Sequence, residues 1–383
     1  MSTGRYLRPM PTLPLSSRLS QALIAYTIEF DDEAELRILH GTTVGGLEGM
    51  RAGGVWFTSQ VMWTNFIRHM DNRGRPVREV QALACLSENA IKSRLHHLEW
   101  WHYLTFAPDP KDPRPKPRYL DQLVKLTPNG EKAAKGWAPI SAEVDKRWRK
   151  RFGTTNVDNL TSALTKVVAA EAADLPDYMP VVDYQDGMRA TLRMPEESPP
   201  RTPVTKLDLS GLLSRALLAL TLEFERESDV SLTATANVSR VVGDSGLPLK
   251  DIPPRAGVAK EGVVALVNFL TKTGRTSLGT DKAKTVKLTA KGKQARDDGA
   301  RILSTIEKRW EKALGKQTVD AIRGGLDSVI GSTKFVEGLT PHETGWRLNK
   351  RYIAQTNAVL ADPSAALPHH PMITHRGGFP DGC

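Results

Sequence analysis

Apolar residues recur at helical spacing over residues 15–30, which predicts an amphipathic helix near the start of the chain. Residues 209–224 repeat this spacing 194 positions later and end in the same Glu-Phe pair. Residues 57–70 also favour a helix, whereas the glycine-rich residues 40–55 favour a long loop. The pattern therefore predicts a mainly helical chain in which at least one helix occurs twice.

A second repeat starts with the tetrapeptide Val-Lys-Leu-Thr at residues 124–127, which returns at residues 286–289. The similarity continues without a gap, at a constant separation of 162 positions. Alternating apolar and polar residues favour a half-buried strand. Threonine is a good N-cap, and the proline that follows it in the first copy suits the first position of a helix. Each copy is therefore expected to be a strand that leads directly into a long helix, which ends near residue 168 or residue 330.

Residues 76–101 predict two short helices joined by a tight turn. Apolar residues at helical spacing mark the inner face of each helix, and Ser87 suits the N-cap of the second. Residues 248–270 align with this stretch at a separation of 172 positions. Two short helices with a tight turn form the helix-turn-helix pattern, whose second helix enters the major groove of DNA.

A β-hairpin is expected after each helix-turn-helix. In the first copy, residues 102–106 and 119–127 favour strands on either side of a proline-punctuated loop at residues 108–117. The second copy has a shorter loop at residues 274–284. Such a hairpin is the wing of a winged helix.

These repeats divide the chain into four parts. We expect a first copy at residues 15–170, a connection at 171–207, a second copy at 208–331, and a C-terminal helix with a docking tail at 340–383. Thr340-Pro341-His342-Glu343 has the form of a capping box and predicts the start of that helix. The tail segment Leu-Pro-His-His-Pro-Met echoes Leu-Pro-Asp-Tyr-Met-Pro in the connection, so the duplication is expected to include the tail.

The order of elements in each copy resembles that of the MarR family of winged-helix transcription regulators. The resemblance rests on a wing that ends in Leu-Thr-x-x-Gly before a long helix, and it covers most of residues 15–168 and 209–330. It implies a mainly α fold with small β-wings. Family members dimerise as separate chains, whereas this chain carries two tandem winged helix-turn-helix units and is expected to form an intramolecular pseudo-dimer. The resemblance also implies a DNA-binding transcription regulator, which we expect to be a repressor that responds to a small apolar effector.

Composition supports a polyanionic partner. The 383 residues carry a formal net charge of +10, and the sequence pI is about 9.5, which favours binding to nucleic acid. Hydrophobic residues make up 40% of the chain, enough for packed cores, and no apolar run approaches the length of a membrane span. The 2 cysteines exclude a disulfide framework, and the N-terminus lacks a signal-peptide core, so we expect a cytoplasmic protein.

Candidate DNA contacts in the first copy lie on the outer face of the second short helix and on the wing loop. Amide, hydroxyl, ammonium and imidazole groups on a helix can reach base edges or phosphates, and a stiff basic loop suits a narrow minor groove. A solvated helix face and a basic surface loop without a partner are the plainer alternatives. The candidates on the helix are Ser87, Glu88, Asn89, Lys92, Ser93 and His96, and those on the wing are Lys111, Arg114, Lys116 and Arg118.

The second copy has fewer groups that can read bases. The equivalent face of its helix carries Ala259, Lys260, Glu261, Val264, Ala265 and Asn268. Sequence specificity is therefore expected to reside in the first copy, while the second contacts mainly phosphates. The candidates for these contacts are Arg255, Lys260, Arg275, Lys282 and Lys284.

Trp63, Trp100 and Trp101 are candidates for binding the apolar effector, since Trp100 and Trp101 lie where the second short helix meets the wing. In the family that the sequence resembles, such a ligand binds between the winged-helix lobe and the dimerisation helices. Ordinary core packing is the alternative for each tryptophan.

Other reactive side chains favour structural roles. Cys85 ends the first short helix, where we expect a buried structural cysteine. His369, His370 and His375 lack the Cys/His spacing of a closed metal site, so we expect a docking tail and no metal. The sequence shows no paired acids, nucleophile elbow or phosphate-binding loop, so neither a cofactor nor enzymatic activity is expected.

Two alternatives stay open at this point. A nucleic-acid enzyme of the base-excision glycosylase type would need an acid or glutamine constellation between the copies. A protein-interaction scaffold whose winged helices do not bind DNA would fit the donor-poor second helix face. The partner that we expect is double-stranded DNA, bound by a monomeric pseudo-dimer or by a homodimer of it, with no membrane partner.

Overall fold

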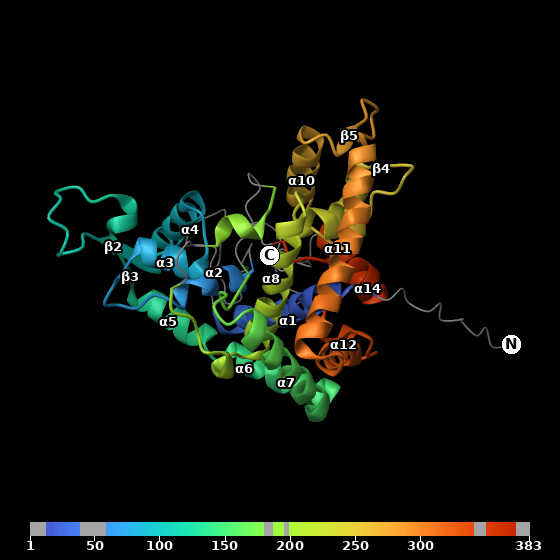
Figure 1. Ribbon diagram of the computed structural model, residues 1–383. Helices are drawn as coiled ribbons and strands as arrows, with labels where there is room; N and C mark the ends of the chain where they lie inside the picture. Colours follow the sequence, from blue (N-terminus) through green and yellow to red (C-terminus); the bar gives the residue numbers. More distant parts are fainter. Residues whose placement is uncertain (1–12, 39–58, 180–186, 195–198, 341–349, 373–383) are drawn as a thin grey trace.

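The computed structural model describes residues 13–38, 59–179, 187–194, 199–340 and 350–372. These residues form mainly α-helices, with two small antiparallel sheets at separate extremities of the molecule (Figure 1). A mainly α fold with small sheets is thereby confirmed. The glycine-rich stretch at residues 40–55 and residues 341–343 of the expected capping box lie outside the described residues.

The first copy contains a three-stranded sheet and a long series of helices. Its helices are α1 Leu15–Arg37, α2 Gln60–Ile67, α3 Val77–Ala84, α4 Glu88–Trp100, α5 Pro128–Trp137, α6 Ile140–Phe152 and α7 Thr154–Glu171. Its strands are β1 Arg75–Pro76, β2 Leu104–Ala107 and β3 Leu123–Leu126, with β3 between the other two. A short 3-10 helix, η2 Tyr119–Asp121, precedes β3.

The second copy repeats this order with shorter elements around its sheet. Its helices are α8 Leu209–Glu227, the π-helix η6 Ala234–Ser239, α9 Ile252–Ala256, α10 Lys260–Lys272, α11 Ala290–Leu314 and α12 Lys316–Ile330. Its strands are β4 Leu247–Pro248, β5 Thr276–Leu278 and β6 Thr285–Leu288, with β6 in the middle, as β3 is in the first sheet. The remaining short helices are η4 Ala190–Arg193, η5 Val204–Lys206, η7 Leu249–Asp251, η8 Phe335–Gly338, α13 Lys350–Ala361 and α14 Pro363–Ala366.

The repeated Leu-Thr-x-x-Gly forms the corner between the middle strand and the following helix. Thr127 Oγ1 donates to the His102 carbonyl at 2.6 Å and accepts from the Gly130 N–H at 3.2 Å. A side chain at Gly130 would place its Cβ 1.9 Å from the Tyr103 carbonyl oxygen, so the position requires glycine. The same bonds recur at Thr289, whose Oγ1 donates to Gly274 and accepts from Gly292. The motif therefore holds the start of each long helical segment against the residues that precede β2 or β5.

The single long helix expected after each corner is broken. In the first copy, α5 ends before Pro139, which lacks an N–H to continue the helical hydrogen bonds, and α6 begins after it. Gly153 then separates α6 from α7 with a φ of 92°. In the second copy, Gly315 separates α11 from α12 with a φ of 85°. The expectation of an uninterrupted helix was wrong, although the helical segments end close to the expected residues.

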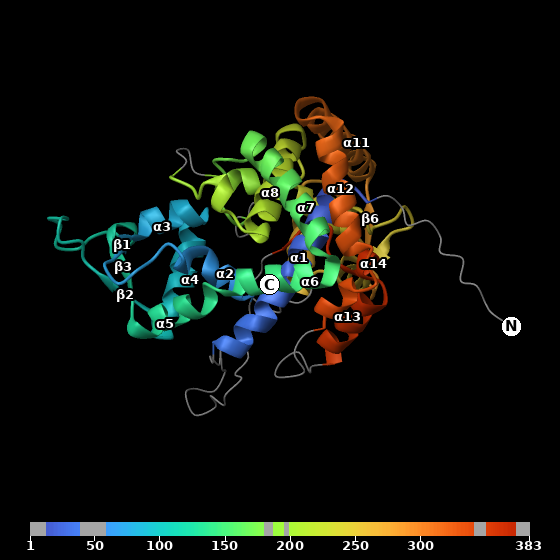
Figure 2. The ribbon, with the colours of Figure 1, turned by 90° about the horizontal axis from the view of Figure 1, so that it is seen from below.

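The copies pack through equivalent helices. Helix α1 contacts α8, and α7 contacts α12, and α7 and α12 lie at the lower side of the molecule in Figure 1. Helices α7 and α8, and α1 and α12, are also in contact, so the four helices form one group (Figure 2). One apolar core contains residues of both copies, among them Leu19, Leu164, Leu213 and Leu326. A smaller core lies around α9, α10 and the second sheet. One continuous apolar core therefore joins the two copies, and the second sheet with its short helices has a smaller core of its own.

Each first helix also begins against an acid of the other copy. The backbone N–H of Leu15 donates to Glu307 Oε1 at 2.8 Å, which satisfies one of the free N–H groups at the start of α1. The backbone N–H of Leu209, at the start of α8, bonds to Asp145 of α6 in the same way. These reciprocal bonds fix the position of each first helix on the partner copy.

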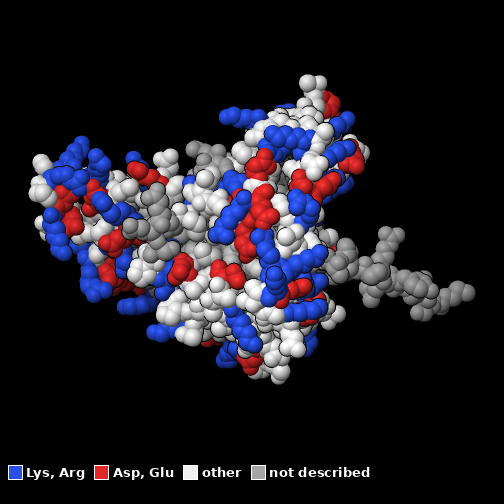
Figure 3. All heavy atoms as spheres, in the orientation of Figure 1, with Lys and Arg blue, Asp and Glu red and all other residues white. Residues whose placement is uncertain are grey.

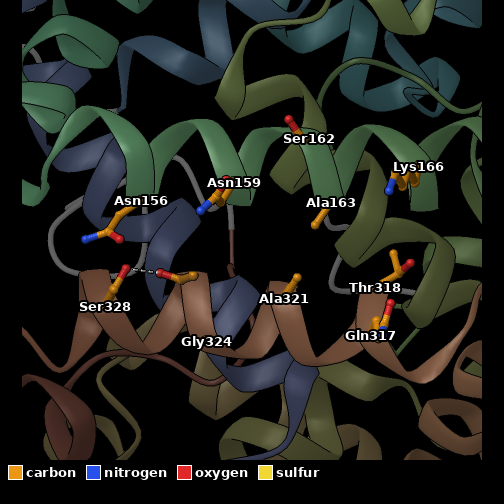
Figure 4. A pocket seen from close by; sticks show the side chains of 11 residues that line it. Asn156, Asn159, Ser162, Ala163, Lys166, Gln317, Thr318, Ala321, Gly324 and Ser328 are labelled. Carbon is orange, nitrogen blue, oxygen red and sulfur yellow. Dashed lines mark hydrogen bonds between the residues drawn. The ribbon is translucent and has the colours of Figure 1, made fainter.

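Helices α7 and α12 run antiparallel beside a polar groove of about 470 Å³ (Figure 4). Asn156 lies near Ser328 at one end, and Lys166 lies near Thr318 at the other. Because Thr318 and Ser328 are 162 positions after Asn156 and Lys166, this pairing is the one that a two-fold relation between the copies requires. Gly325 allows the close approach, since a Cβ there would lie 2.9 Å from Leu160 Cβ.

The C-terminal segment is built into the body of the protein. Residues 366–372 are buried, and His369 Nδ1 hydrogen-bonds Ser17 of α1 at 3.0 Å. The backbone N–H groups of His369 and His370 donate to Asn237 Oδ1 at 3.1 and 3.2 Å. The similar segment of the connection bonds instead to the first helix of the second copy, because Asp177 accepts from Arg215 of α8 at 2.7 Å. Among the described residues, no helix has the length and apolar character needed to cross a bilayer.

Candidate nucleic-acid interface

Helix α4 presents a polar face to solvent because its apolar residues recur every three to four positions and leave polar residues on the opposite face. Ser87 caps it, and the Ser87 hydroxyl accepts from the Ala90 N–H at 3.2 Å. The apolar side chains of the helix are turned inward and are buried, namely Ile91, Leu95 and Leu98. Ser87 is half-buried, and the other candidate DNA contacts on the helix are exposed, namely Glu88, Asn89, Lys92, Ser93 and His96. The structure thus brings the candidates of α4 together on one accessible face.

The turn before α4 is fixed by a left-handed residue. Cys85 ends α3 with a φ of 53° and is buried, and its Sγ accepts from the Arg201 guanidinium at 3.4 Å. Burial raises the pKa of the Cys85 thiol above its usual value. The expectation of a buried structural cysteine is confirmed.

The wing loop carries exposed cations, but one of them is held in place. Lys111, Lys116 and Arg118 are exposed. Arg114 is also exposed, but it bridges Asp112 and Asp121, each at 2.5 Å. The Arg114 guanidinium hydrogen-bonds Asp112 and lowers the pKa of that carboxyl to about 2. Arg114 therefore shapes the loop, and three exposed wing cations can reach a partner.

Three further arginines, Arg73, Arg75 and Arg78, lie near the first sheet and are not among the predicted contacts. Strand β1 pairs with β3, with Arg75 opposite Val124, while Arg73 precedes β1 and Arg78 lies in the first turn of α3. Each has an acidic partner, in Asp71, Glu79 and Asp121 respectively. Figure 3 shows Lys and Arg gathered over this end of the molecule, with acidic side chains among them. The Arg-x-Arg-x-x-Arg spacing was the only signal for them in the sequence.

The second copy keeps most of its predicted cations on the surface, with one exception. Arg255, Lys260, Lys282 and Lys284 are exposed. Arg275 is 5% exposed, its guanidinium pairs with Asp229, and it donates to the Thr273 carbonyl. It takes the place of the buried Tyr103 of the first copy, 172 positions earlier, where the chain turns inward after the helix. Arg275 is thus buried, unlike the other predicted cations of this copy.

The helix face of the second copy is partly covered. Ala259 is buried, and Val264 and Ala265 are half-buried, which leaves Lys260, Glu261 and Asn268 exposed. The turn before α10 lies against the C-terminal segment, since a Cβ at Gly257 would approach the Ala366 carbonyl oxygen to 2.0 Å. A cavity of about 510 Å³ separates this corner from α13. The surface that faces solvent here is smaller and poorer in hydrogen-bond donors than that of α4.

The three candidate tryptophans do not form one site. Trp63 is buried and packs edge-on against Trp101, with ring centroids 5.2 Å apart. Trp100 points to the surface and is 68% exposed. The contact between Trp63 and Trp101 is the one expected of core packing.

The tail histidines are buried hydrogen-bonding groups. His370 lies between Thr221 and Thr233, with contacts of 3.2 and 3.0 Å. Burial lowers the pKa of His369 to about 3 and that of His370 to about 4. Within the described ranges, no group of three or more His, Cys, Asp or Glu side chains is placed to hold a metal ion, and His375 lies outside those ranges.

Comparisons with protein-family models, with curated proteins and with solved structures find no significant match to this chain.

Proposed function

We propose that the chain is a sequence-specific DNA-binding transcription regulator, and specifically a repressor. In this proposal, each copy is a winged helix-turn-helix unit of the kind that the sequence resembles, and the shared core makes the two units an intramolecular pseudo-dimer. Helices α3 and α4 are the helix-turn-helix of the first unit, and β2 and β3 are its wing. Helices α9 and α10 and strands β5 and β6 are the corresponding parts of the second unit.

One observation carries the proposal. The exposed polar face of α4 and the exposed cations of the wing loop lie at one end of the molecule, joined by the short sheet. An α-helix with amide, hydroxyl and ammonium groups on its outer face fits the major groove, and the neighbouring cations fit the phosphates on either side. The acidic side chains at this end limit the net attraction, so hydrogen bonds on α4 must supply much of the specificity.

Covalent linkage has a consequence for the target. Because the copies belong to one chain, the packing of one on the other does not depend on protein concentration. Their DNA-facing residues differ, so the preferred target need not be palindromic. The small apolar effector stays a prediction of the resemblance, since Trp63 and Trp101 pack on each other.

A salt titration tests the proposal. A fluorescein-labelled duplex of the gene's own upstream region is titrated with protein at several salt concentrations. Eight exposed cations, four in the first copy and four in the second, give an expected slope of about −7 in log K against log [salt] at one contact each. They are Lys92, Lys111, Lys116 and Arg118, and Arg255, Lys260, Lys282 and Lys284. Binding that is unaffected by salt, or equal for a scrambled duplex, would contradict a sequence-specific regulator. The absence of binding to any duplex would favour the scaffold alternative.

A further inference from the structure

Trp100 is the most exposed large apolar side chain among the described residues, at 68%. Trp63, Trp137, Trp148 and Trp310 are each at most 4% exposed. Burying a large apolar side chain stabilises a protein by about 1.5–3 kcal/mol relative to leaving it in water. An indole that remains in water on an ordered helix is therefore well placed to contact a partner, and its neighbours indicate which one.

The neighbours are the candidate base-reading residues. Asn89, Ser93, His96 and Trp100 follow each other at spacings of four, three and four, so they form one line along α4. All four are exposed. The line extends over about 16 Å at a rise of 1.5 Å per residue. The major groove of B-DNA is about 12 Å wide, so a helix whose first turns read bases carries the far end of this line to the sugar-phosphate backbone.

The indole has the chemistry for that position. Its N–H is a hydrogen-bond donor without an acceptor function, which suits a phosphate oxygen, and its ring offers apolar surface to a deoxyribose. Lys92, on the same exposed side, supplies the charge that a polyanion requires. Glu99, 42% exposed and 3.7 Å from His96, is the one acid beside Trp100 on this part of the helix.

The second copy supports a backbone contact at this point. The residue 172 positions after Trp100 is Lys272, which is exposed at the end of α10. The two copies thus place two different residues at the end of the corresponding helix, and both can donate to phosphate.

We propose that Trp100 anchors α4 to the DNA backbone, with its indole N–H donating to a phosphate oxygen and its ring packing on the adjacent sugar. This inference rests on the proposed function. It adds a positioning residue at the end of the helix that does not read sequence, and it explains the exposure of the indole in the absence of DNA.

The test compares Trp100→Phe, which keeps an aromatic ring but loses the N–H, with Trp100→Ala, which loses both. Leu36→Ala serves as the control, because Leu36 is 61% exposed on α1. Affinity for the upstream duplex is measured by fluorescence anisotropy, and circular dichroism confirms the fold. We expect about a tenfold loss for Trp100→Phe, as for one hydrogen bond to a charged group, a larger loss for Trp100→Ala, and none for Leu36→Ala.

Two further readouts separate this role from a structural one. A backbone contact carries no sequence information, so the losses should be equal on the upstream duplex and on a scrambled one. Protein labelled with 5-fluorotryptophan should show a ¹⁹F resonance that shifts when DNA is added and is absent in Trp100→Phe. Wild-type affinity in both variants, losses confined to the upstream duplex, or an unshifted resonance would overturn the inference. Wild-type protein that binds no duplex would instead overturn the proposed function itself.

Discussion

The indole N–H of Trp148 donates to the carboxylate of Glu29 at 2.9 Å, and Trp310 donates to Glu223 at 2.6 Å. In the sequence, Glu29 and Trp148 belong to two separate repeats, one with a separation of 194 positions and the other with 162. The structure shows that one repeat supplies the glutamate and the other supplies the tryptophan of the same hydrogen bond. In each copy, that contact joins the first helix to the helical segment that follows the sheet.

The first prediction concerns this contact. Trp148→Phe removes a hydrogen bond to a buried carboxylate, although Arg151 continues to pair with Glu29 at 2.5 Å. Hydrogen bonds to charged groups contribute about 1.5–3 kcal/mol, so the free energy of unfolding in urea should fall by about 2 kcal/mol. Trp310→Phe should behave similarly. The exposed Trp100→Phe is the matched control, and an equal stability of all three variants would contradict the assignment.

The second prediction concerns the corner glycines. Gly130→Ala would force a Cβ to 1.9 Å from the Tyr103 carbonyl oxygen, and Gly292→Ala would do the same at Arg275. Each should lower the free energy of unfolding by about 2–3 kcal/mol, as overpacking does. In Gly324→Ala the new Cβ meets no atom within 4 Å, and the gain in helix propensity should stabilise the protein by about 1 kcal/mol. Thermal and urea unfolding would show whether the free energy of unfolding falls in the first two variants and rises in Gly324→Ala.

Much of the fold follows from local signals in the sequence. Helix faces, the Ser87 cap and the corner at Thr127 are decided by residues within four positions of each other, so periodicity and capping rules find them. The repeat predicts one continuous helix across Pro139 and Gly153, whereas the structure breaks the helix at both residues. There, a local backbone restriction prevails over the helical pattern.

The candidate site was less predictable because long-range pairing decides which side chains reach the surface. Arg275 follows the second helix as a wing residue should, yet the turn of the chain buries it against Asp229. Arg73 and Arg75 precede the first short helix, yet pairing of β1 with β3 carries them to the wing. Spacing along the chain cannot show either outcome, since both depend on contacts with distant residues.

The third prediction is a loss of stability in acid that depends on the tail histidines. Burial lowers the pKa of His370 to about 4, compared with 6.5 for a free side chain, so below pH 6.5 the unfolded chain binds more protons than the folded one. Stability should therefore be fully present above pH 6.5 and should fall as the pH decreases toward 4. At pH 5 the expected cost of His370 is on the order of 2 kcal/mol.

A variant isolates this contribution. His370→Gln keeps a polar group between Thr221 and Thr233 but cannot be protonated, so its unfolding free energy should vary less between pH 7 and pH 5 than that of the wild type. The comparison uses urea unfolding at both pH values. Parallel curves for the two proteins would show that His370 is not the titrating group.

The fourth prediction is that the two copies contribute unequally to sequence recognition. Asn89 and Lys92 are exposed on the face of α4, whereas the corresponding face of α10 has lost donors and is partly covered. The double substitution Asn89→Ala, Lys92→Ala should remove most of the preference for the upstream duplex over a scrambled one, since each base contact discriminates by about 1–3 kcal/mol. Lys260→Ala, Asn268→Ala should weaken binding to both duplexes by a similar factor, because it removes mainly a phosphate contact.

Anisotropy on both duplexes measures the two effects, and equal losses of preference in the two double variants would show that both copies read bases. In that case the buried Ala259 and the half-buried Val264 and Ala265 would have to become accessible on DNA, which requires the C-terminal segment at Ala366 to move away from the turn at Gly257.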